Sequence, residues 1–93
     1  MRTINQTSQF KKDLKRESRG RHSKYLGAEL QAILTLLVTD HPLPPNHRDH
    51  ALTGEWQDFR DSHIRPDLVL IYRKPDGDKL ELVRLGSHSE LGL

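Results

Sequence analysis

The first half of the chain spaces its apolar residues as two consecutive helices would. Phe10 and Leu14, four positions apart, mark a narrow apolar stripe on a helix that residues 7–8 would cap and that ends near residue 19. A second helix is predicted over residues 23–39. It carries the largest apolar block of the chain, at helical spacing: Leu26, Leu30, Ile33, Leu34 and Leu37. The pattern therefore predicts a helical hairpin.

The second half changes to the pattern of strands. Residues 68–72 form a continuous apolar run, which is typical of a central strand covered on both faces. Prolines at 42, 44 and 45 separate this half from the helices, and residues 75–78 predict a turn. Further strands are predicted at residues 55–61 and 79–87, with an edge strand at residues 2–6. We expect an α+β fold in which a small antiparallel sheet carries an N-terminal two-helix hairpin on one face.

A length of 93 residues, 33% of them hydrophobic, leaves room for only one small core. We therefore expect a single domain spanning residues 1–93. Because the chain has no cysteine, disulfides, thiolate zinc sites and thiol nucleophiles are excluded. No apolar run approaches the roughly 20 residues of a membrane span, and the N-terminus lacks the apolar region of a signal peptide. We expect a cytoplasmic protein with no membrane association.

Positive charge is concentrated in residues 11–24. Seven basic residues against two acidic ones give this segment a charge of +5, which leaves −3 on the rest of a chain of net charge +2. Such a segment suits the phosphate backbone of RNA, or it is a solvated helix face in which Asp13 and Glu17 pair with neighbouring basic residues. The candidate RNA-binding residues are Lys11, Lys12, Lys15, Arg16, Arg19, Arg21 and Lys24.

Histidine is the most distinctive residue type, with six in the chain, four of them between His41 and His63. Asp61 and His63 are two positions apart, so on a strand they share a face. Arg84 and His88 have the same parity and would face the same surface if their strand pairs with the central one. Imidazoles can take and give a proton near neutral pH, and a guanidinium can stabilise a phosphorane. The set therefore suits metal-independent cleavage of RNA by attack of a 2′-hydroxyl on the adjacent phosphate.

Plainer interpretations exist for the same residues. Asp61 and His63 can be exposed strand-end residues, and Arg84 can pair with Glu81 or Asp67. A metal site is a weaker interpretation, because the chain has no HExxH motif and none of the compact ligand spacings of structural zinc sites. We therefore expect neither a metal nor another cofactor.

Three segments resemble the YafQ-type toxins of bacterial type II toxin–antitoxin systems. They are residues 48–56 with the pattern H-x-L-x-G-x-W, residues 59–72 with R-D-x-H and P-D, and residues 83–91 with an arginine followed after three residues by a histidine. The resemblance is close in the second half, and the first half agrees in its layout of a basic helix followed by a leucine-rich helix. It implies the RelE/ParE superfamily fold.

The resemblance also implies a ribosome-dependent endoribonuclease that cleaves mRNA in the decoding site and is silenced by a cognate antitoxin. Carried over by position, the catalytic cluster is His50, Asp61, His63, Asp67 and His88, and the phosphate-binding residue is Arg84. His88 would be the general acid or one of an acid–base pair. The base would come from His50, His63 or a carboxylate, most readily Asp67. The remaining histidines, His22, His41 and His47, are expected to be surface residues.

One departure from the family pattern lies at the C-terminus. Such toxins often carry an aromatic residue a few positions after the last histidine, where this chain has Leu91-Gly92-Leu93. Either another group positions the nucleotide or the codon preference is looser.

Two further functions compete with RNA cleavage. The first is a non-enzymatic ParE-like toxin that inhibits gyrase or another protein, which has no need of the His/Asp/Arg cluster. The second is an RNA-binding module, which the absence of RNP and GXXG motifs disfavours.

Overall fold

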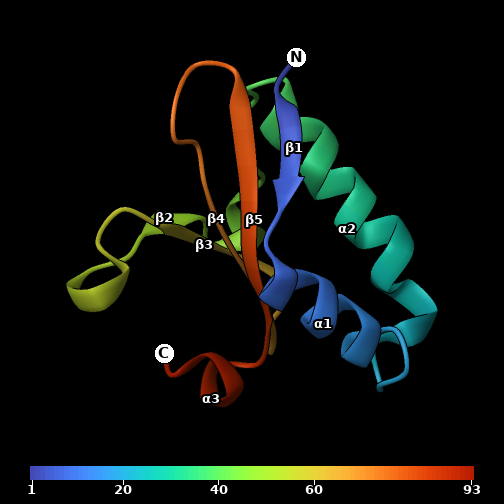
Figure 1. Cartoon of the computed structure of the whole chain (residues 1–93). Coiled ribbons are helices and arrows are strands. Elements are labelled where there is room, and N and C mark those ends of the chain that lie inside the picture. The colour runs from blue at the N-terminus through green and yellow to red at the C-terminus, as the bar shows by residue number, and fades with distance from the viewer.

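A computed structural model describes all 93 residues as one five-stranded sheet with two long helices on one side (Figure 1). The helices are α1 (Ser8–Glu17), α2 (Ser23–Val38) and the short α3 (His88–Leu91), and 3₁₀ turns cover Pro45–His47 and Gly54–Trp56. The strands are β1 (Thr3–Gln6), β2 (His50–Ala51), β3 (Arg60–Arg65), β4 (Leu68–Arg73) and β5 (Lys79–Gly86), which lie in the order β1-β5-β4-β3-β2. No helix of the structure is both long and apolar enough to cross a membrane.

Thr7 caps α1 and also fastens it to the sheet. Its hydroxyl oxygen accepts a hydrogen bond from the Phe10 N–H at 2.9 Å and donates one to the Val83 carbonyl at 2.8 Å. The predicted helix start is therefore confirmed, and the helix ends at Glu17, two residues earlier than expected. The hairpin of α1 and α2 packs on one face of the sheet, as the apolar pattern predicts.

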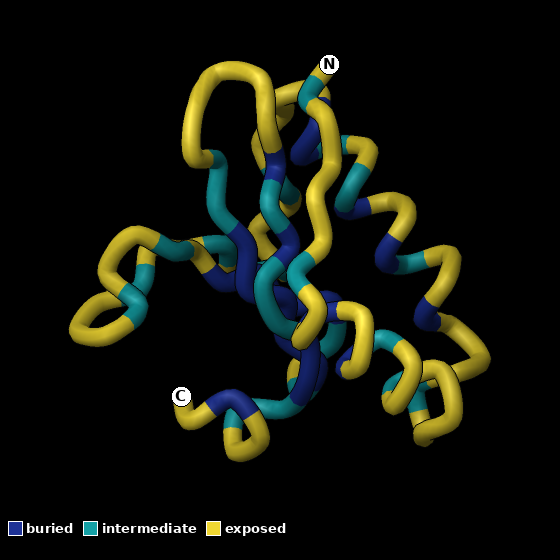
Figure 2. Tube along the Cα trace, in the orientation of Figure 1, coloured by how far each residue is buried: buried dark blue, intermediate teal, exposed yellow.

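The apolar core has two parts, because β4 is buried on both faces (Figure 2). Leu68, Leu70 and Tyr72 point toward α1 and α2 and belong to a cluster of 13 buried residues. Val69 and Ile71 point to the other face, where they pack with Leu91 of α3. The continuous apolar run of β4 is thus explained by burial of both faces. The helical hairpin covers one face, and α3 covers part of the other.

Two of our expectations for the sheet are wrong. The sheet is mixed and has five strands, because β1 pairs in parallel with β5 and the two-residue β2 adds the opposite edge. The strand expected over residues 55–61 begins only at Arg60, since Gly54, with a φ of 67°, starts a 3₁₀ turn that removes Trp56 from the sheet. Strand pairing depends on contacts distant in sequence, which local patterns do not report.

The short helix α3 was missed, although the chain contains its signal. Ser87 and Glu90 form a capping box: the Ser87 hydroxyl accepts the Glu90 N–H, and the Glu90 carboxylate accepts the Ser87 N–H at 2.9 Å. His88 therefore opens a helix instead of continuing β5, so its strand parity with Arg84 does not describe its position.

Candidate active site

Three of the predicted histidines gather on the sheet face opposite α1 and α2. His50 of β2 pairs in register with Asp61 of β3, and His63 lies two residues further along β3 on the same face. His63 is opposite Val69 of β4, which is itself opposite Gly86 at the end of β5. The chain then turns into α3, and the His88 ring comes to lie edge-on to that of His63, with 5.0 Å between the ring centroids.

Asp61 supplies a buried carboxylate beneath these rings. It is 3% exposed, and its Oδ1 lies 3.0 Å from Nδ1 of His50. Burial raises the pKa of Asp61, while the imidazoles of His50, His63 and His88 act against that rise. The pKa of Asp61 therefore lies above its usual value, because the effect of burial is larger than that of the three imidazoles.

The neighbours of His50 determine which of its nitrogens is free. Nδ1 lies 2.7 Å from the Arg48 carbonyl oxygen and 3.0 Å from the Asp61 carboxylate, and both can only accept. The proton of the neutral ring therefore resides on Nδ1. Nε2 is left with its lone pair, on a side chain that is 55% exposed.

His63 is held in the neutral form. Burial lowers the pKa of His63, nearby Asp61 raises it in part, and His88 lowers it further. The backbone of His63 is also anchored, because Nδ1 of His47 donates a hydrogen bond to its carbonyl at 2.7 Å. His47, expected as a plain surface residue, is half-buried and supports the strand that carries His63.

Titration of the His63 ring tests this environment. We expect an NMR titration of its imidazole to give a midpoint below 6.5, and a lower midpoint still in Asp61→Asn, because that change removes the negative charge that opposes the effect of burial. The lowered pKa also makes stability depend on pH. Between the pKa of His63 in the folded protein and its higher pKa in the unfolded chain, only the unfolded chain binds a proton at this ring, so stability falls as pH drops below about 6.5. A midpoint that moves upward in Asp61→Asn would contradict this assignment.

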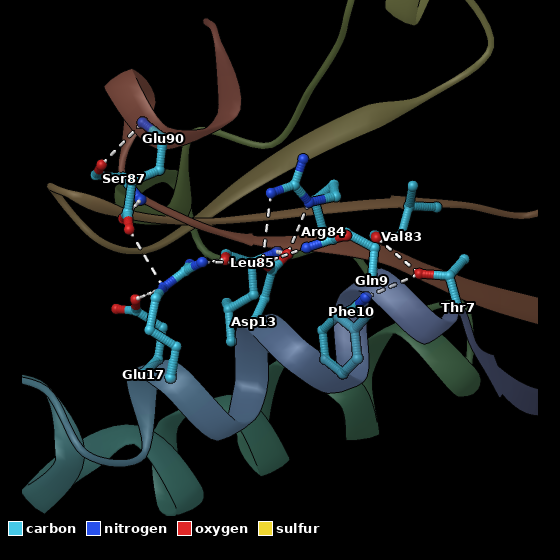
Figure 3. Close-up of polar contacts among 11 residues, drawn as sticks. Thr7, Gln9, Phe10, Asp13, Glu17, Val83, Arg84, Leu85, Ser87 and Glu90 are labelled. Carbon is cyan, nitrogen blue, oxygen red and sulfur yellow. Dashed lines mark hydrogen bonds and ion pairs between the residues drawn. The ribbon is translucent and has the colours of Figure 1, made fainter.

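Arg84 lies on the same sheet face, at a β-bulge. The register passes from Ile71 opposite Arg84 to Tyr72 opposite Leu82, so Val83 is the extra residue of β5. Nε of Arg84 donates to Oδ2 of Asp13 at 2.7 Å, and the Leu85 N–H donates to the same oxygen at 3.0 Å (Figure 3). The plainer interpretation, in which Arg84 pairs with Glu81 or Asp67, is wrong, since its carboxylate partner comes from α1, 71 residues away.

A surface hollow of about 480 Å³ opens beside the imidazoles. His50, Asp61 and His88 form one part of its wall, and Leu52, Trp56 and Leu93 form another. The largest hollow, about 510 Å³ between α2 and the Pro45–His47 turn, touches His47 but none of the predicted catalytic residues. Of the predicted catalytic residues, His50, Asp61 and His88 thus line the second hollow, while His63 lines a smaller one with Asn46, Arg48 and Pro66. No group of three or more His, Asp or Glu residues is placed to hold a metal ion.

Comparisons with known proteins identify the family of the chain. The model of the YafQ family, a bacterial toxin of type II toxin–antitoxin systems, matches residues 2–92. The chain belongs to this family. The mRNA interferase toxin YafQ of Escherichia coli K12 is 37% identical over 91 residues, which are 97% of this chain and 95% of that protein.

Two crystal structures extend the YafQ similarity to three dimensions. That of YafQ from E. coli strain BL21(DE3) has a TM-score of 0.83 at 35% identity and covers 98% of both chains. That of the E. coli DinJ–YafQ complex has a TM-score of 0.78 at 33% identity, again covering 98% of both chains. The α+β fold expected from the resemblance is therefore confirmed.

Asp67 of this YafQ-family chain contacts an arginine and not one of the imidazoles. It lies in the turn between β3 and β4 and forms an ion pair with Arg21 from the turn between α1 and α2. Its Oδ1 is buried and accepts no hydrogen bond. The preceding residue, Pro66, lines a small hollow together with His63, so Asp67 is adjacent in sequence to the site.

The basic segment divides into two kinds of residue. Arg16 is tied to other parts of the fold although its side chain is 41% exposed. Its guanidinium donates hydrogen bonds to Asp13 and to the Leu85 carbonyl, and it forms ion pairs with Glu17 and with Glu90 of α3. It approaches β5 so closely that a Cβ on Gly86 would lie 2.9 Å from Nη2 of Arg16. Arg21 is exposed and forms an ion pair with Asp67. The remaining basic residues of the segment are also exposed: Lys11, Lys12, Lys15, Arg19 and Lys24.

Sequence reasoning missed the role of Asp13, which it considered only as a partner of neighbouring basic residues on a solvated helix face. The residue is fully buried and holds Arg84, Arg16 and the Leu85 N–H together. One signal was present, because Asp13 lies three residues after Phe10 and one before Leu14, on the apolar side of α1. A carboxylate in that position needs buried partners, and the arginines supply them.

Proposed function

We propose that this protein is the toxin of a type II toxin–antitoxin pair and an endoribonuclease that cleaves mRNA on the ribosome, in the cytoplasm, as a single domain of residues 1–93. The observation that carries the proposal is the convergence of His50, His63 and His88 around buried Asp61, with Arg84 on the same sheet face. The mRNA interferase name of the E. coli relative supports the same activity.

The reaction needs one base, one acid and one cation. The base takes the proton of a ribose 2′-hydroxyl, whose oxygen bonds to the adjacent phosphorus. The bond from phosphorus to the 5′-oxygen then breaks as the acid protonates that oxygen. The products are a 2′,3′-cyclic phosphate and a 5′-hydroxyl end, with no net change in protons, and no metal is required.

We assign the base to His50 and the acid to His88, because both line the hollow beside the buried carboxylate. Nε2 of His50 is free to accept a proton, and its ring is oriented by Arg48 and Asp61. A neutral His63 next to His88 imposes no like-charge repulsion on a protonated His88 ring. His63 and Asp67 are the alternative bases.

Arg84 is the proposed phosphate ligand. Asp13 engages its Nε and, at 3.4 Å, its Nη2, so the guanidinium is held at one edge while Nη1 takes no part in this contact. A fixed cation of this kind stabilises the charge that develops on the phosphorane without reorganising during the reaction.

The partners follow from surface charge and from the relatives. The exposed basic residues of α1 and of the following turn suit ribosomal RNA, which would give a salt-dependent affinity without sequence specificity. E. coli YafQ has been crystallised in complex with DinJ, and we propose that a cognate antitoxin binds this chain in the same way.

Mapping of transcript ends with and without ribosomes tests the function. We expect new 5′ ends in an mRNA incubated with the protein and ribosomes, none with the protein alone, and no loss of cleavage by the protein when EDTA is added to preformed complexes at a level that leaves the ribosomes intact. Intact mRNA together with accumulated DNA damage in expressing cells would instead favour a ParE-like gyrase inhibitor.

A further inference from the structure

The hollow beside the imidazoles has one aromatic wall. Trp56, from the 3₁₀ turn Gly54–Trp56, lines it together with His50, Asp61 and His88. It is the only aromatic carbocycle among the nine lining residues and the only tryptophan in the chain. The indole therefore lies where a substrate bound to the two histidines would extend.

The C-terminal residues do not offer an alternative stacking surface. Leu91 is 4% exposed and packs with Val69 and Ile71 in the second part of the core. Gly92 and Leu93 line the hollow but have no π-face. In this chain an aromatic platform has to come from another element.

Contacts with Phe59 stabilise the turn that carries Trp56. The Trp56 and Phe59 rings meet edge to face, with 5.4 Å between their centroids and 83° between their planes, and the guanidinium of Arg73 lies 5.4 Å from the Phe59 centroid. The Phe59 N–H donates to the Trp56 carbonyl and the Leu52 N–H donates to the Phe59 carbonyl, each at 2.9 Å. The indole is therefore held at a defined position while remaining half-exposed.

We propose that Trp56 is the base-stacking platform of the substrate site and binds a nucleobase of the mRNA next to the scissile phosphate. This inference rests on the proposed function. A nucleobase is flat and partly apolar, and stacking on an indole accepts every base, so the contact positions the nucleotide with little sequence preference. The hollow, at about 480 Å³, has the size of a small-molecule site.

A double-mutant cycle, with one change in Trp56 and the other in the nucleobase of the substrate, tests the proposal. Single-turnover cleavage of ribosome-bound mRNA is measured for the wild type and Trp56→Leu, on intact mRNA and on mRNAs that carry one abasic ribose at each position around the cleavage site. We expect Trp56→Leu to slow cleavage roughly 5- to 150-fold. At one position of the abasic ribose, removing the base should slow cleavage by the wild type by a similar factor. The same removal should slow cleavage by Trp56→Leu only a little further.

Tyr25→Leu is the matched control, because it removes an exposed aromatic ring of α2 that does not line the hollow. It should show no coupling to any base, and Trp56→Phe should recover most of the rate. Wild-type cleavage by Trp56→Leu, or the same loss on intact and abasic mRNA at every position, would overturn the stacking role. A wild type that cleaves no mRNA on ribosomes would instead refute the proposed function.

Discussion

Replacing His88 by alanine is expected to slow mRNA cleavage about 10²- to 10⁴-fold, the usual contribution of a general acid or base. Without the imidazole, the 5′-oxygen leaves unprotonated, and the ring beside His63 is lost. The fold should persist, because α3 is capped by Ser87 and Glu90 and anchored by Leu91, none of which depends on the His88 side chain. Cleavage rates on ribosome-bound mRNA and thermal unfolding of the same preparations measure the two effects.

His41→Ala is the control for this change, since His41 is an exposed histidine before the proline-rich connector and lines none of the hollows. It should cleave at the wild-type rate. A His88→Ala protein that is folded and cleaves as fast as the wild type would remove His88 from the catalytic cluster.

Replacing Asp13 by alanine is expected to produce the largest loss of stability in the chain. The change leaves the Leu85 N–H without its acceptor, and it removes the shared counter-charge of the partly buried Arg84 and of Arg16. Removing one partner of a buried ion pair costs about 3–5 kcal/mol, a large part of the roughly 5–15 kcal/mol that stabilises a domain. Urea unfolding at neutral pH, compared with the exposed-site control Asp58→Ala, measures the loss.

The pH dependence of stability gives an independent measure of the same carboxylate. Burial acts to raise the pKa of Asp13, but hydrogen bonds from Arg84, the Leu85 N–H and Gln9 outweigh it and hold the pKa below 3.8. A carboxyl whose pKa is lowered in the folded state contributes stability above its unfolded pKa and loses it as pH falls through the folded value. The wild type should therefore lose stability below about pH 4 more steeply than Asp13→Asn. Equal slopes would show that the carboxylate charge contributes nothing.

The local elements could be predicted because their signals are local. The Thr7 cap, the leucine spacing of α2 and the apolar run of β4 each act within a few residues, and all three elements occur where expected. The histidines of the cluster were identified by motif, and the alternation of Asp61 and His63 correctly placed both on one sheet face.

The errors arise where the deciding partner is distant in sequence. The parallel pairing of β1 with β5 joins residues 76 positions apart, as in Thr3 opposite Lys79, and no local propensity reports it. Arg16 remains a candidate RNA-binding residue with a 41% exposed side chain, but its contacts with Leu85 and Glu90 were not predicted. A charged side chain has the same sequence signature whether water or a buried carboxylate solvates it.

By itself, the sequence determined the helical hairpin, the central strand, the family and the candidate residues for the chemistry, because periodicity, caps and motifs are encoded in short stretches of chain. Only the tertiary structure decided which groups lie together: that His88 turns back on a capped helix to meet His63, that Asp13 of α1 holds Arg84, and that Trp56 lines the hollow. These placements follow from strand order, a bulge in β5 and the desolvation of charge, which arise only when distant segments pack together.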